Sequence, residues 1–214
     1  MQVNLKSITP NAEVNIVEIA RVSSSRQDKS EAPEGLINYL IKHKHWSPFE
    51  HSFITFEIIT SKAIGIQLLR HRSFTFQEFS QRYAVVQEAE PVEIRRQADR
   101  NRQSSEEVFN PLCIIEQGVH PNASELVQNT IDMCFKSYEA LITAGVAKEC
   151  ARMVLPMATQ TTIYMTGSIR SWIHFLEIRD DGHAQKEAQL IAREIKKLFI
   201  QELPIISKAL NYIQ

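Results

Sequence analysis

Two stretches in the N-terminal half of the chain alternate apolar and polar side chains with the period of a β-strand. They cover residues 2–8 and 53–59, and the second is rich in β-branched and aromatic residues. A weaker alternation over residues 159–165 predicts a third strand. A turn is expected at Ser47-Pro48, ahead of the second strand.

Apolar residues at helical spacing predict a series of helices, and polar residues mark their ends. Thr60 or Ser61 is placed to cap one helix, and Asn122 and Gly145 are placed to begin and end a longer one. A helix after Ser168 carries an apolar stripe for burial, formed by Ile169, Trp172, Ile173 and Leu176. The predicted helices cover 34–43, about 61–70, 122–145, 147–154 and most of the chain after Ser168.

Residues 85–122 follow neither period. Short apolar runs interrupt a mixture of Gln, Asn, Ser, proline and arginine, the last at Arg95, Arg96, Arg100 and Arg102. Segments of this length without regular structure are often lids or mobile loops. Plain solvated surface explains the composition equally well, so both interpretations stand.

Composition predicts one globular domain over residues 1–214, because 43% of the residues are hydrophobic and no shift in composition divides the chain. The net charge of −1, from 24 basic and 25 acidic side chains, argues against a protein that coats nucleic acid. The cysteines Cys113, Cys134 and Cys150 are odd in number and far apart, so neither a disulfide framework nor a thiolate zinc site is indicated. With no signal peptide and no apolar run long enough to span a bilayer, we expect a soluble, cytoplasmic protein.

The densest group of chemically active side chains begins at Arg70-His71-Arg72 and continues, after seven residues, with Ser80-Gln81-Arg82-Tyr83. Arginine presents a planar fork of donors that matches phosphate and carboxylate oxygens in pairs. Gln67 and Glu78 add groups that can read polar edges of a ligand, and three phenylalanines in the interval can supply walls. The group predicts a site for an anion, and the alternative is a solvated basic helix end.

A second group joins His43, His45, Glu50 and His51. Histidines and carboxylates are common ligands of zinc and iron, but this spacing matches no established zinc signature. Surface histidines at a helix end explain the group without a metal.

Two isolated arginines, Arg179 and Arg152, each allow two interpretations. Arg179 falls near the apolar side of its helix if the helix continues that far, where a charge needs an anionic or polar partner. If the helix has ended, Arg179 is only a C-terminal charge. Arg152 lies among apolar residues and either binds a ligand or pairs with a core carboxylate. No Rossmann or P-loop motif occurs, and the sequence assigns no base to a Ser80 nucleophile.

The Arg-His-Arg-x7-Ser pattern resembles the signature of flavin-dependent thymidylate synthases. Further blocks in the family's order support the resemblance: Ala20-Arg21-Val22-Ser23, Pro48-Phe49-Glu50-His51, Ala151-Arg152 through Leu155-Pro156, and Arg179 through Gln185. The resemblance implies a mixed α/β (α+β) fold, with a central, mostly antiparallel sheet and helices packed around it. It also implies a homotetramer with its sites where subunits meet.

The implied activity is synthesis of dTMP from dUMP, with 5,10-methylenetetrahydrofolate as carbon donor, NADPH as reductant and FAD as cofactor. Arg179 resembles the catalytic residue that favours ionisation at N3 of the uracil, which makes C5 nucleophilic without an enzyme cysteine. The implied dUMP-binding residues are Gln67, Arg70, Glu78, Ser80, Gln81, Arg82, Arg152 and Arg179.

The implied FAD-binding residues are Ser23, His45, Ser47, Glu50, Arg70, His71, Arg72, Ser168, Arg170, His174, Ile178 and His183. Some positions depart from the family pattern: Thr75 replaces a common serine, Gln81 a common glycine, and Ser168 and His174 common asparagines. These departures concern individual contacts and leave the reaction class unchanged.

Two functions from other classes compete with this interpretation. The arginines could form a nucleotide-binding or RNA-binding module, whose affinity would fall steeply with salt. The histidine group could instead form a metal-dependent hydrolase, which a chelator would inactivate. A flavin absorption band in the purified protein separates the synthase from both.

Overall fold

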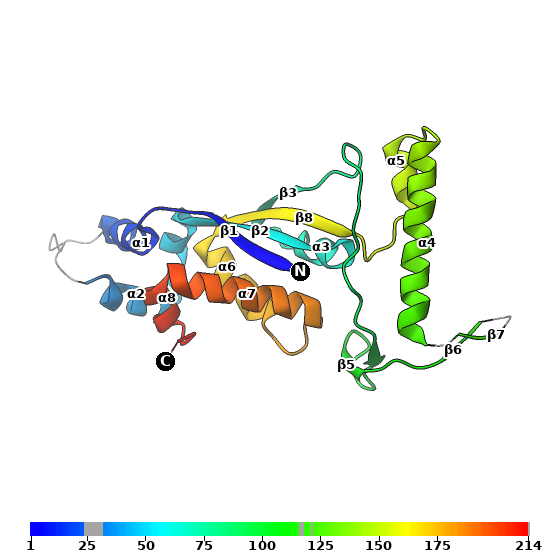
Figure 1. The fold of residues 1–214 in the computed structure, drawn as a ribbon. Helices are drawn as coiled ribbons and strands as arrows, with labels where there is room; N and C mark the ends of the chain where they lie inside the picture. The colour runs from blue at the N-terminus through cyan, green and yellow to red at the C-terminus, as the bar shows by residue number, and fades with distance from the viewer. Residues whose placement is uncertain (24–31, 116–117, 121, 214) are drawn as a thin grey trace. The chain divides into compact units, whose positions relative to one another are not determined.

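The computed structural model describes residues 1–23, 32–115, 118–120 and 122–213. Four strands form one sheet in the order β1-β2-β8-β3 (Figure 1). These strands are β1 (Gln2–Ile8), β2 (Phe53–Ser61), β8 (Gln160–Ser168) and β3 (Phe74–Glu78). The expected strands over 2–8, 53–59 and 159–165 are therefore present, the last two extending further than the alternation indicated.

Hydrogen bonds between the strands give their directions. The side chain of Asn4 donates a hydrogen bond to Glu57, and the backbone N–H of Thr9 donates one to the carbonyl of Phe53. Residue numbers therefore rise along β1 as they fall along β2. The backbone of Phe79 bonds Thr162, and the side chain of Thr75 reaches the backbone of Thr166. Neighbouring strands therefore run antiparallel, and the expected mixed α+β class with an antiparallel sheet is confirmed.

The helices carry the caps that the sequence indicated. Ser61, Asn122 and Ser168 each accept a hydrogen bond from the backbone three residues on, and Gly145 adopts a left-handed φ of 84°. The α-helices are α1 (Ala12–Ala20), α2 (Pro33–Lys42), α3 (Lys62–Leu68), α4 (Ala123–Thr143), α5 (Lys148–Ala151), α6 (Ile169–Arg179), α7 (Lys186–Glu202) and α8 (Pro204–Ala209). Short 3-10 helices cover Arg21–Ser23, Ser47–His51 and Arg152–Val154.

Outside the segment 85–122, helix α1 and strand β3 have no counterpart in the sequence prediction. Helix α1 is rich in valine and isoleucine, which lowers its intrinsic helix propensity. Strand β3 has only five residues, too few for a clear alternation. Tertiary packing decides both elements: Ile16 and Val17 of α1 and Phe74 of β3 are buried.

The segment 85–122, expected to be irregular, contains two β-hairpins. They pair β4 (Arg95–Gln97) with β5 (Ser105–Val108), and β6 (Cys113–Ile115) with β7 (Gly118–His120). In the first hairpin, Arg96 pairs with Glu107 at 2.6 Å and lies 4.1 Å from the ring centre of Phe109. Cross-strand polar and cation–π contacts stabilise a hairpin of this kind without an apolar alternation, which is why the periodicity did not reveal it.

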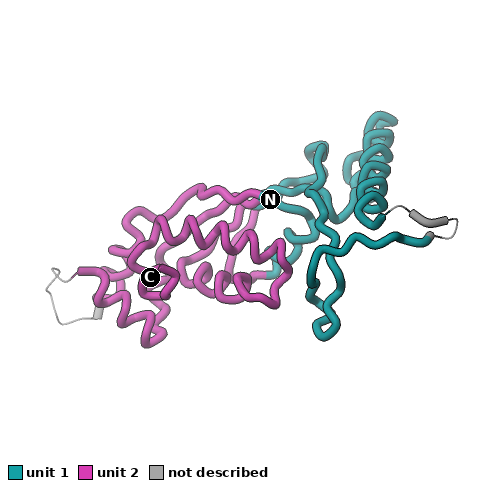
Figure 2. Tube along the Cα trace, turned by 60° about the horizontal axis from the view of Figure 1, so that its bottom comes forward, with its two compact units in different colours: residues 1, 59–70, 78–163 teal, residues 2–58, 71–77, 164–214 magenta. Residues whose placement is uncertain are grey.

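The chain divides into two compact units, shown in teal and magenta in Figure 2. The first unit comprises residues 1, 59–70 and 78–163, and the second comprises 2–58, 71–77 and 164–214. Along the described chain, no helix is long and apolar enough to cross a membrane.

The second unit has the larger apolar core. Its aromatic centre is Trp172 of α6, whose ring centre lies 4.6 Å from that of Phe74 and 4.9 Å from that of Phe56. The indole Nε1 donates a hydrogen bond of 3.1 Å to the carbonyl of Ile54, so the one polar atom of Trp172 is satisfied. The predicted stripe on α6 is buried as expected. Burial of each such side chain contributes about 1.5–3 kcal/mol.

The first unit has a smaller core, centred on Val86, Tyr138 of α4 and Ala151 of α5. The hydroxyl of fully buried Tyr138 accepts a hydrogen bond from the backbone N–H of Val86 at 3.5 Å. This hydrogen bond holds the start of the segment 85–122 against α4.

Candidate functional site

The predicted site residues separate between the two units. All predicted dUMP ligands except Arg179 lie in the first unit, and all predicted FAD ligands except Arg70 lie in the second. Because Arg70 and His71 are consecutive, the signature motif spans the boundary between the units.

Glu78, at the end of β3, is the most firmly held of the first group. Its Oε1 accepts hydrogen bonds from Lys62 Nζ and from Thr161 Oγ1, each of 2.8 Å. Lys62 is the first residue of α3 and Thr161 lies near the start of β8. Side chains from two other elements, α3 and β8, therefore fix the Glu78 carboxylate.

Ser80, Gln81 and Arg82 form a turn directly after β3. The Ser80 carbonyl accepts the backbone N–H groups of Tyr83 and Ala84 at 3.0 and 3.2 Å. Gln81 is 8% exposed, whereas Arg82 is exposed and pairs with Glu149 of α5 at 3.2 Å. The Ser80 hydroxyl has no hydrogen-bonded base among the described residues, so the geometry does not support a Ser80 nucleophile.

Arg152 follows three residues after Glu149, at the end of α5. In the described part of the chain, no carboxylate lies within ion-pair distance of Arg152, which argues against the alternative of a core salt bridge. Gln67 lies in α3, but the helix ends at Leu68, so exposed Arg70 lies in the turn beyond it. The prediction that Gln67 and Arg70 share one helix was therefore wrong by a few residues, a common error at helix ends.

A cavity of about 230 Å³ lies in the first unit next to Glu78. We call it the first-unit cavity; it is lined by Phe79, Val85, Val86, Gln87, Glu88, Gln160, Thr161 and Thr162. Thr161 therefore contacts both this cavity and the Glu78 carboxylate.

The second unit contains a larger cavity of about 430 Å³. This second-unit cavity is lined by Trp46, Glu50, Ser73, Arg170, Ser171, Ile173, His174 and Glu177. Arg170 and His174, four residues apart on α6, both face it, as the helical spacing predicted.

Glu50, in the 3-10 helix Ser47–His51, contacts two residues at the start of α6. Its Oε1 pairs with Arg170 at 2.7 Å, and its Oε2 accepts the Ser168 hydroxyl at 2.7 Å. The Ser168 oxygen also accepts the backbone N–H of Ser171, which caps α6. Ser168 therefore holds Glu50 in place while it caps the helix.

His71 and Arg179 are in direct contact within the second unit. Arg179 Nε donates to His71 Nε2 at 2.9 Å, so the neutral imidazole carries its proton on Nδ1. Burial, followed by the charges of Arg179 and His174, lowers the pKa of His71 to about 4. The ring of Phe175, 5.0 Å away, forms part of this burial. His71 is thus an uncharged acceptor at neutral pH, and Arg179 is more than a helix-terminal charge.

The adjacent Asp180 anchors the end of α6 to α7. Its carboxylate accepts hydrogen bonds from Arg193 at 3.0 Å and Lys196 at 2.9 Å. Burial raises the pKa of Asp180, but these two hydrogen bonds and the charges of their donors outweigh burial, so the pKa lies below its usual value.

Several predicted FAD ligands do not line the second-unit cavity. His45, Ser47 and Arg72 are exposed, and Ile178 is 42% exposed. His183 is exposed and contacts Asp181 at 2.7 Å. Ser23 is the last residue of a 3-10 helix. The group of His43, His45, Glu50 and His51 forms no metal-binding cluster, and no other such cluster occurs among the described residues.

Comparison with known proteins decides the family. A family model described as "Thymidylate synthase complementing protein" matches residues 4–205. The chain belongs to this family. The "Probable flavin-dependent thymidylate synthase" of Paramecium bursaria Chlorella virus 1 is 44% identical over 204 residues, which cover 94% of this chain and 92% of that protein.

A second relative and a solved structure are also similar to this chain. The "Flavin-dependent thymidylate synthase" of a Synechocystis strain is 40% identical over 197 residues, which cover 92% of this chain and 88% of that protein. Among solved structures, a UMP/dUMP methylase, PolB from Streptomyces cacaoi bound with 5-Br dUMP, superposes with a TM-score of 0.79 at 26% identity. That match covers 99% of this chain and 95% of the other.

Some residues around this family's motifs were missed by the sequence analysis. Trp46 and Ser73 line the second-unit cavity and lie next to predicted residues in the sequence, so adjacency could have indicated them. Lys62, Thr161 and Glu149 contact predicted residues across the fold. No local pattern marks these three, because their partners are distant in sequence.

Proposed function

We propose that this chain is a flavin-dependent thymidylate synthase that converts dUMP to dTMP, with FAD as cofactor and with 5,10-methylenetetrahydrofolate and NADPH as co-substrates. The observation that carries the proposal is the hydrogen bond between Arg179 and His71. It joins the central histidine of Arg70-His71-Arg72 to a second motif 108 residues away. Family membership over residues 4–205 supports the same activity.

Arginines bind the nucleotide in this proposal. Arg70, Arg82 and Arg152 attract the dianionic phosphate by charged hydrogen bonds, and Ser80 completes the shell of donors. Arg82 exchanges Glu149 for phosphate on binding, an exchange that costs little because both side chains of this pair are more than half exposed. Gln67, Gln81 and Glu78 contact the remaining polar edges of dUMP.

Arg179 acts on the uracil. Its fixed positive charge stabilises negative charge at N3, and electron density at C5 rises, so that C5 becomes the nucleophile. His71 holds the Nε side of the guanidinium and, being uncharged, adds no repulsion to a nearby cation. The mechanism requires no cysteine.

The second-unit cavity fits part of an FAD molecule. Its volume of about 430 Å³ lies in the range of roughly 300–1,000 Å³ typical of ligand sites, and Trp46 supplies an aromatic wall. Arg170, His174 and Glu50 supply a cation, a ring nitrogen and a carboxylate for the polar groups of the cofactor. When bound, FAD supplies the electron transfer that reduces the one-carbon unit. The chain's own residues orient the cofactor and shield it from water.

The other predicted FAD ligands complete the proposed site. They would contact parts of the cofactor outside the cavity, because FAD is too large for that space alone. These residues are Ser23, His45, Ser47, Arg70, His71, Arg72, Ser168, Ile178 and His183.

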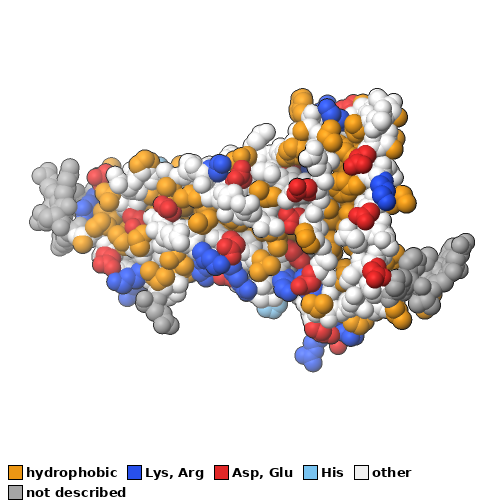
Figure 3. Space-filling view, in the orientation of Figure 1, with side chains coloured by type: hydrophobic (Ala, Val, Ile, Leu, Met, Phe, Trp, Pro, Cys, Tyr) orange, Lys and Arg blue, Asp and Glu red, His pale blue; other side chains and the backbone are white. Residues whose placement is uncertain are grey.

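We further propose one domain over residues 1–214, assembled as a homotetramer in the cytoplasm. Strands β2 and β8 each belong partly to both units, and the family model spans both units. The first unit exposes large apolar side chains, including Tyr83 at 82%, Met153 at 75% and Met133 at 64%. Apolar side chains are visible at the surface around α4 and α5 in Figure 3. Association with further copies would cover them.

A reconstitution assay tests the proposed function. The purified protein should show a flavin absorption band and should release dTMP when supplied with FAD, dUMP, methylenetetrahydrofolate and NADPH. Without dTMP formation and without affinity for dUMP or FAD, the proposal fails. RNA binding with steep salt dependence would favour the binding module, and activity abolished by a chelator would favour the hydrolase.

A further inference from the structure

The two oxygens of the Glu78 carboxylate have different surroundings. Oε1 accepts both the Lys62 ammonium and the Thr161 hydroxyl at 2.8 Å. Oε2 has no hydrogen-bond partner among the described residues. Of the described side chains, only Thr60 and Ser207 have a buried polar atom without a partner, so Glu78 Oε2 is open to solvent. One oxygen is thus fixed and the other is accessible.

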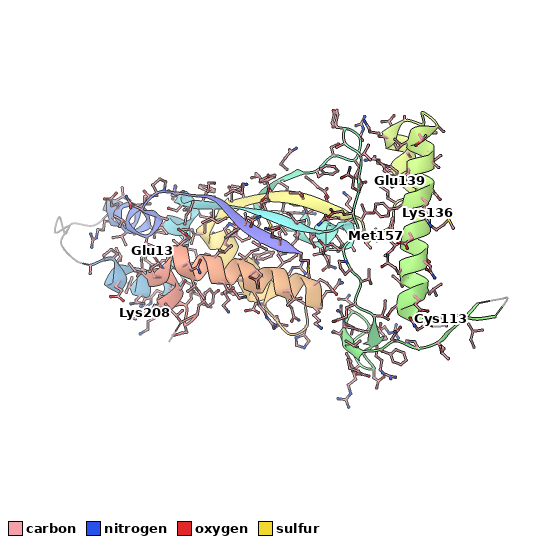
Figure 4. All side chains as sticks on the ribbon, viewed as in Figure 1. Glu13, Cys113, Lys136, Glu139, Met157 and Lys208 are labelled. Atoms are coloured by element: carbon pink, nitrogen blue, oxygen red, sulfur yellow. The ribbon has the colours of Figure 1, made fainter. Side chains whose placement is uncertain are left out.

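The positions of Lys62 and Thr161 are themselves determined by the backbone. The N–H groups of Lys62 and Ala63, in the first turn of α3, donate to the carbonyls of Thr159 and Met157 at 2.8 and 3.0 Å. These bonds attach α3 to the start of β8, close to the labelled Met157 in Figure 4. The helix end that carries Lys62 and the strand that carries Thr161 therefore stay together.

A glycine permits the close approach of α3 to β8. A Cβ atom at Gly65 would lie 3.1 Å from Ile163 Cδ1, 3.3 Å from Thr161 Cγ2 and 3.8 Å from Glu78 Oε1. Thr161 is 2% exposed, so its hydroxyl has little freedom to seek another partner. The Glu78 side chain is 22% exposed and that of Lys62 is 28% exposed, so this ion pair is partly desolvated. Such a pair directs a carboxylate better than a fully exposed pair does.

We propose that Lys62 and Thr161 are positioning residues for dUMP: by holding Glu78 Oε1 they direct Oε2 toward an N–H or O–H donor of the nucleotide. Lys62 has a second effect, because its positive charge balances Glu78 in a site that must attract a dianion. This inference rests on the proposed function. It adds two residues, outside the signature motifs, that determine how well the enzyme binds its substrate.

The test measures dUMP affinity and steady-state kinetics of the FAD-loaded enzyme and of Lys62→Met, Thr161→Val and Glu78→Gln. Lys62→Met should raise KM for dUMP about tenfold and change kcat little, because a ground-state contact is lost. Thr161→Val should raise KM about threefold, and Thr161→Ser, which restores the hydroxyl, should return KM to the wild-type value. Lys197→Met is the matched control, since Lys197 pairs with Glu194 at 2.6 Å on the exposed side of α7.

The double variant Lys62→Met/Glu78→Gln separates positioning from a general loss of stability. If Lys62 acts through Glu78, the double variant should raise KM by less than the product of the two single effects. Fully multiplicative effects would overturn the proposal, as would a KM within twofold of wild type for both Lys62→Met and Thr161→Val. Should Lys62→Met fail to fold, the comparison of Thr161→Val with Thr161→Ser tests the positioning role by itself. A wild-type enzyme that does not bind dUMP would instead refute the proposed function.

Discussion

Arg179 is held at the end of α6 by an uncharged histidine. Its partner, His71, accepts the Nε–H and is kept neutral first by burial and then by neighbouring positive charge. A neutral acceptor orients a guanidinium and leaves its positive charge in place. A carboxylate would orient the guanidinium but would also neutralise its charge. This arrangement suits a cation that must stabilise negative charge on a substrate.

Replacing Arg179 with alanine should therefore reduce kcat by about 10² to 10³, as loss of an electrostatic stabiliser does elsewhere. The flavin absorption band should remain, since Arg179 does not line the second-unit cavity. Arg193→Ala, which alters a cation on α7, serves as a comparison and should cost much less. Unchanged turnover in Arg179→Ala would remove this residue from the mechanism.

His71 should also give the protein a specific pH dependence of stability. Its pKa of about 4 in the folded state lies below the usual 6.5, so the unfolded chain binds the proton at the higher pH. The neutral His71 therefore contributes fully to the free energy of unfolding above pH 6.5, and this contribution is lost as the pH falls toward 4. His71→Gln, which keeps an acceptor but does not titrate, should lose less stability over that interval.

The difference between wild type and His71→Gln should be on the order of 1 kcal/mol, after allowance for partial exposure of the site. Urea unfolding at pH 7.0, 5.5 and 4.5 measures it. His43→Gln controls for loss of an exposed histidine and should follow the wild type. Parallel curves for wild type and His71→Gln would contradict the assignment of a buried, neutral His71.

At the scale of elements, the approach of β3 to β8 depends on one glycine. A Cβ atom at Gly167 of β8 would lie 2.4 Å from two ring atoms of Phe74, a distance that real Cβ contacts do not reach. Phe74 cannot easily move, because its ring packs edge-on against Trp172. The absence of a side chain at Gly167 therefore lets Phe74 of β3 pack closely against β8.

Gly167→Ala should accordingly destabilise the protein by about 1–3 kcal/mol, the usual cost of overpacking a core. Thermal unfolding would show a lower Tm, with retention of the α+β circular dichroism spectrum before the transition. Gly35→Ala is the control, because a Cβ atom at Gly35 meets nothing within 4 Å and lies in helix α2. Equal Tm values for Gly167→Ala and wild type would show that Phe74 has more freedom than the packing indicates.

At the scale of the whole molecule, the two units differ in how well each covers its apolar side chains. Helix α4 has 21 residues, of which Ile131 and Tyr138 are buried. Met133 on the same helix is 64% exposed, and Met153 beyond α5 is 75% exposed. The second unit, in contrast, encloses most of the large aromatic side chains of the core. Under the proposed assembly, these exposed methionines of the first unit are the side chains that association would bury.

Light scattering after gel filtration should give a mass near four times 24.6 kDa, about 98 kDa, for the wild-type protein. Met133→Glu should shift the distribution toward smaller species, because burial of a charge in an apolar interface is unfavourable. Leu190→Glu, at a 40% exposed position on α7, should leave the mass unchanged. A wild-type mass of 24.6 kDa would refute the proposed tetramer.

The linear order of residues was enough to predict several local features of the structure. Helix caps at Ser61, Asn122 and Ser168, the left-handed Gly145 and the buried stripe of α6 depend on neighbours within a few positions, so their physics is contained in short segments. The order of motifs also identified the family correctly, because the chemistry of a nucleotide site requires particular side chains.

Only the tertiary structure decided which distant residues meet. Several contacts join segments that are far apart in the chain, and no local sequence pattern indicates them. They are the contacts of Glu78 with Lys62 and Thr161, of Arg82 with Glu149, and of Gly167 with Phe74. The strand assignment of β3 and the helix assignment of α1 likewise followed from burial rather than from propensity. Local hydrogen bonds are determined by adjacent residues, whereas burial and long-range pairing depend on how the whole chain packs.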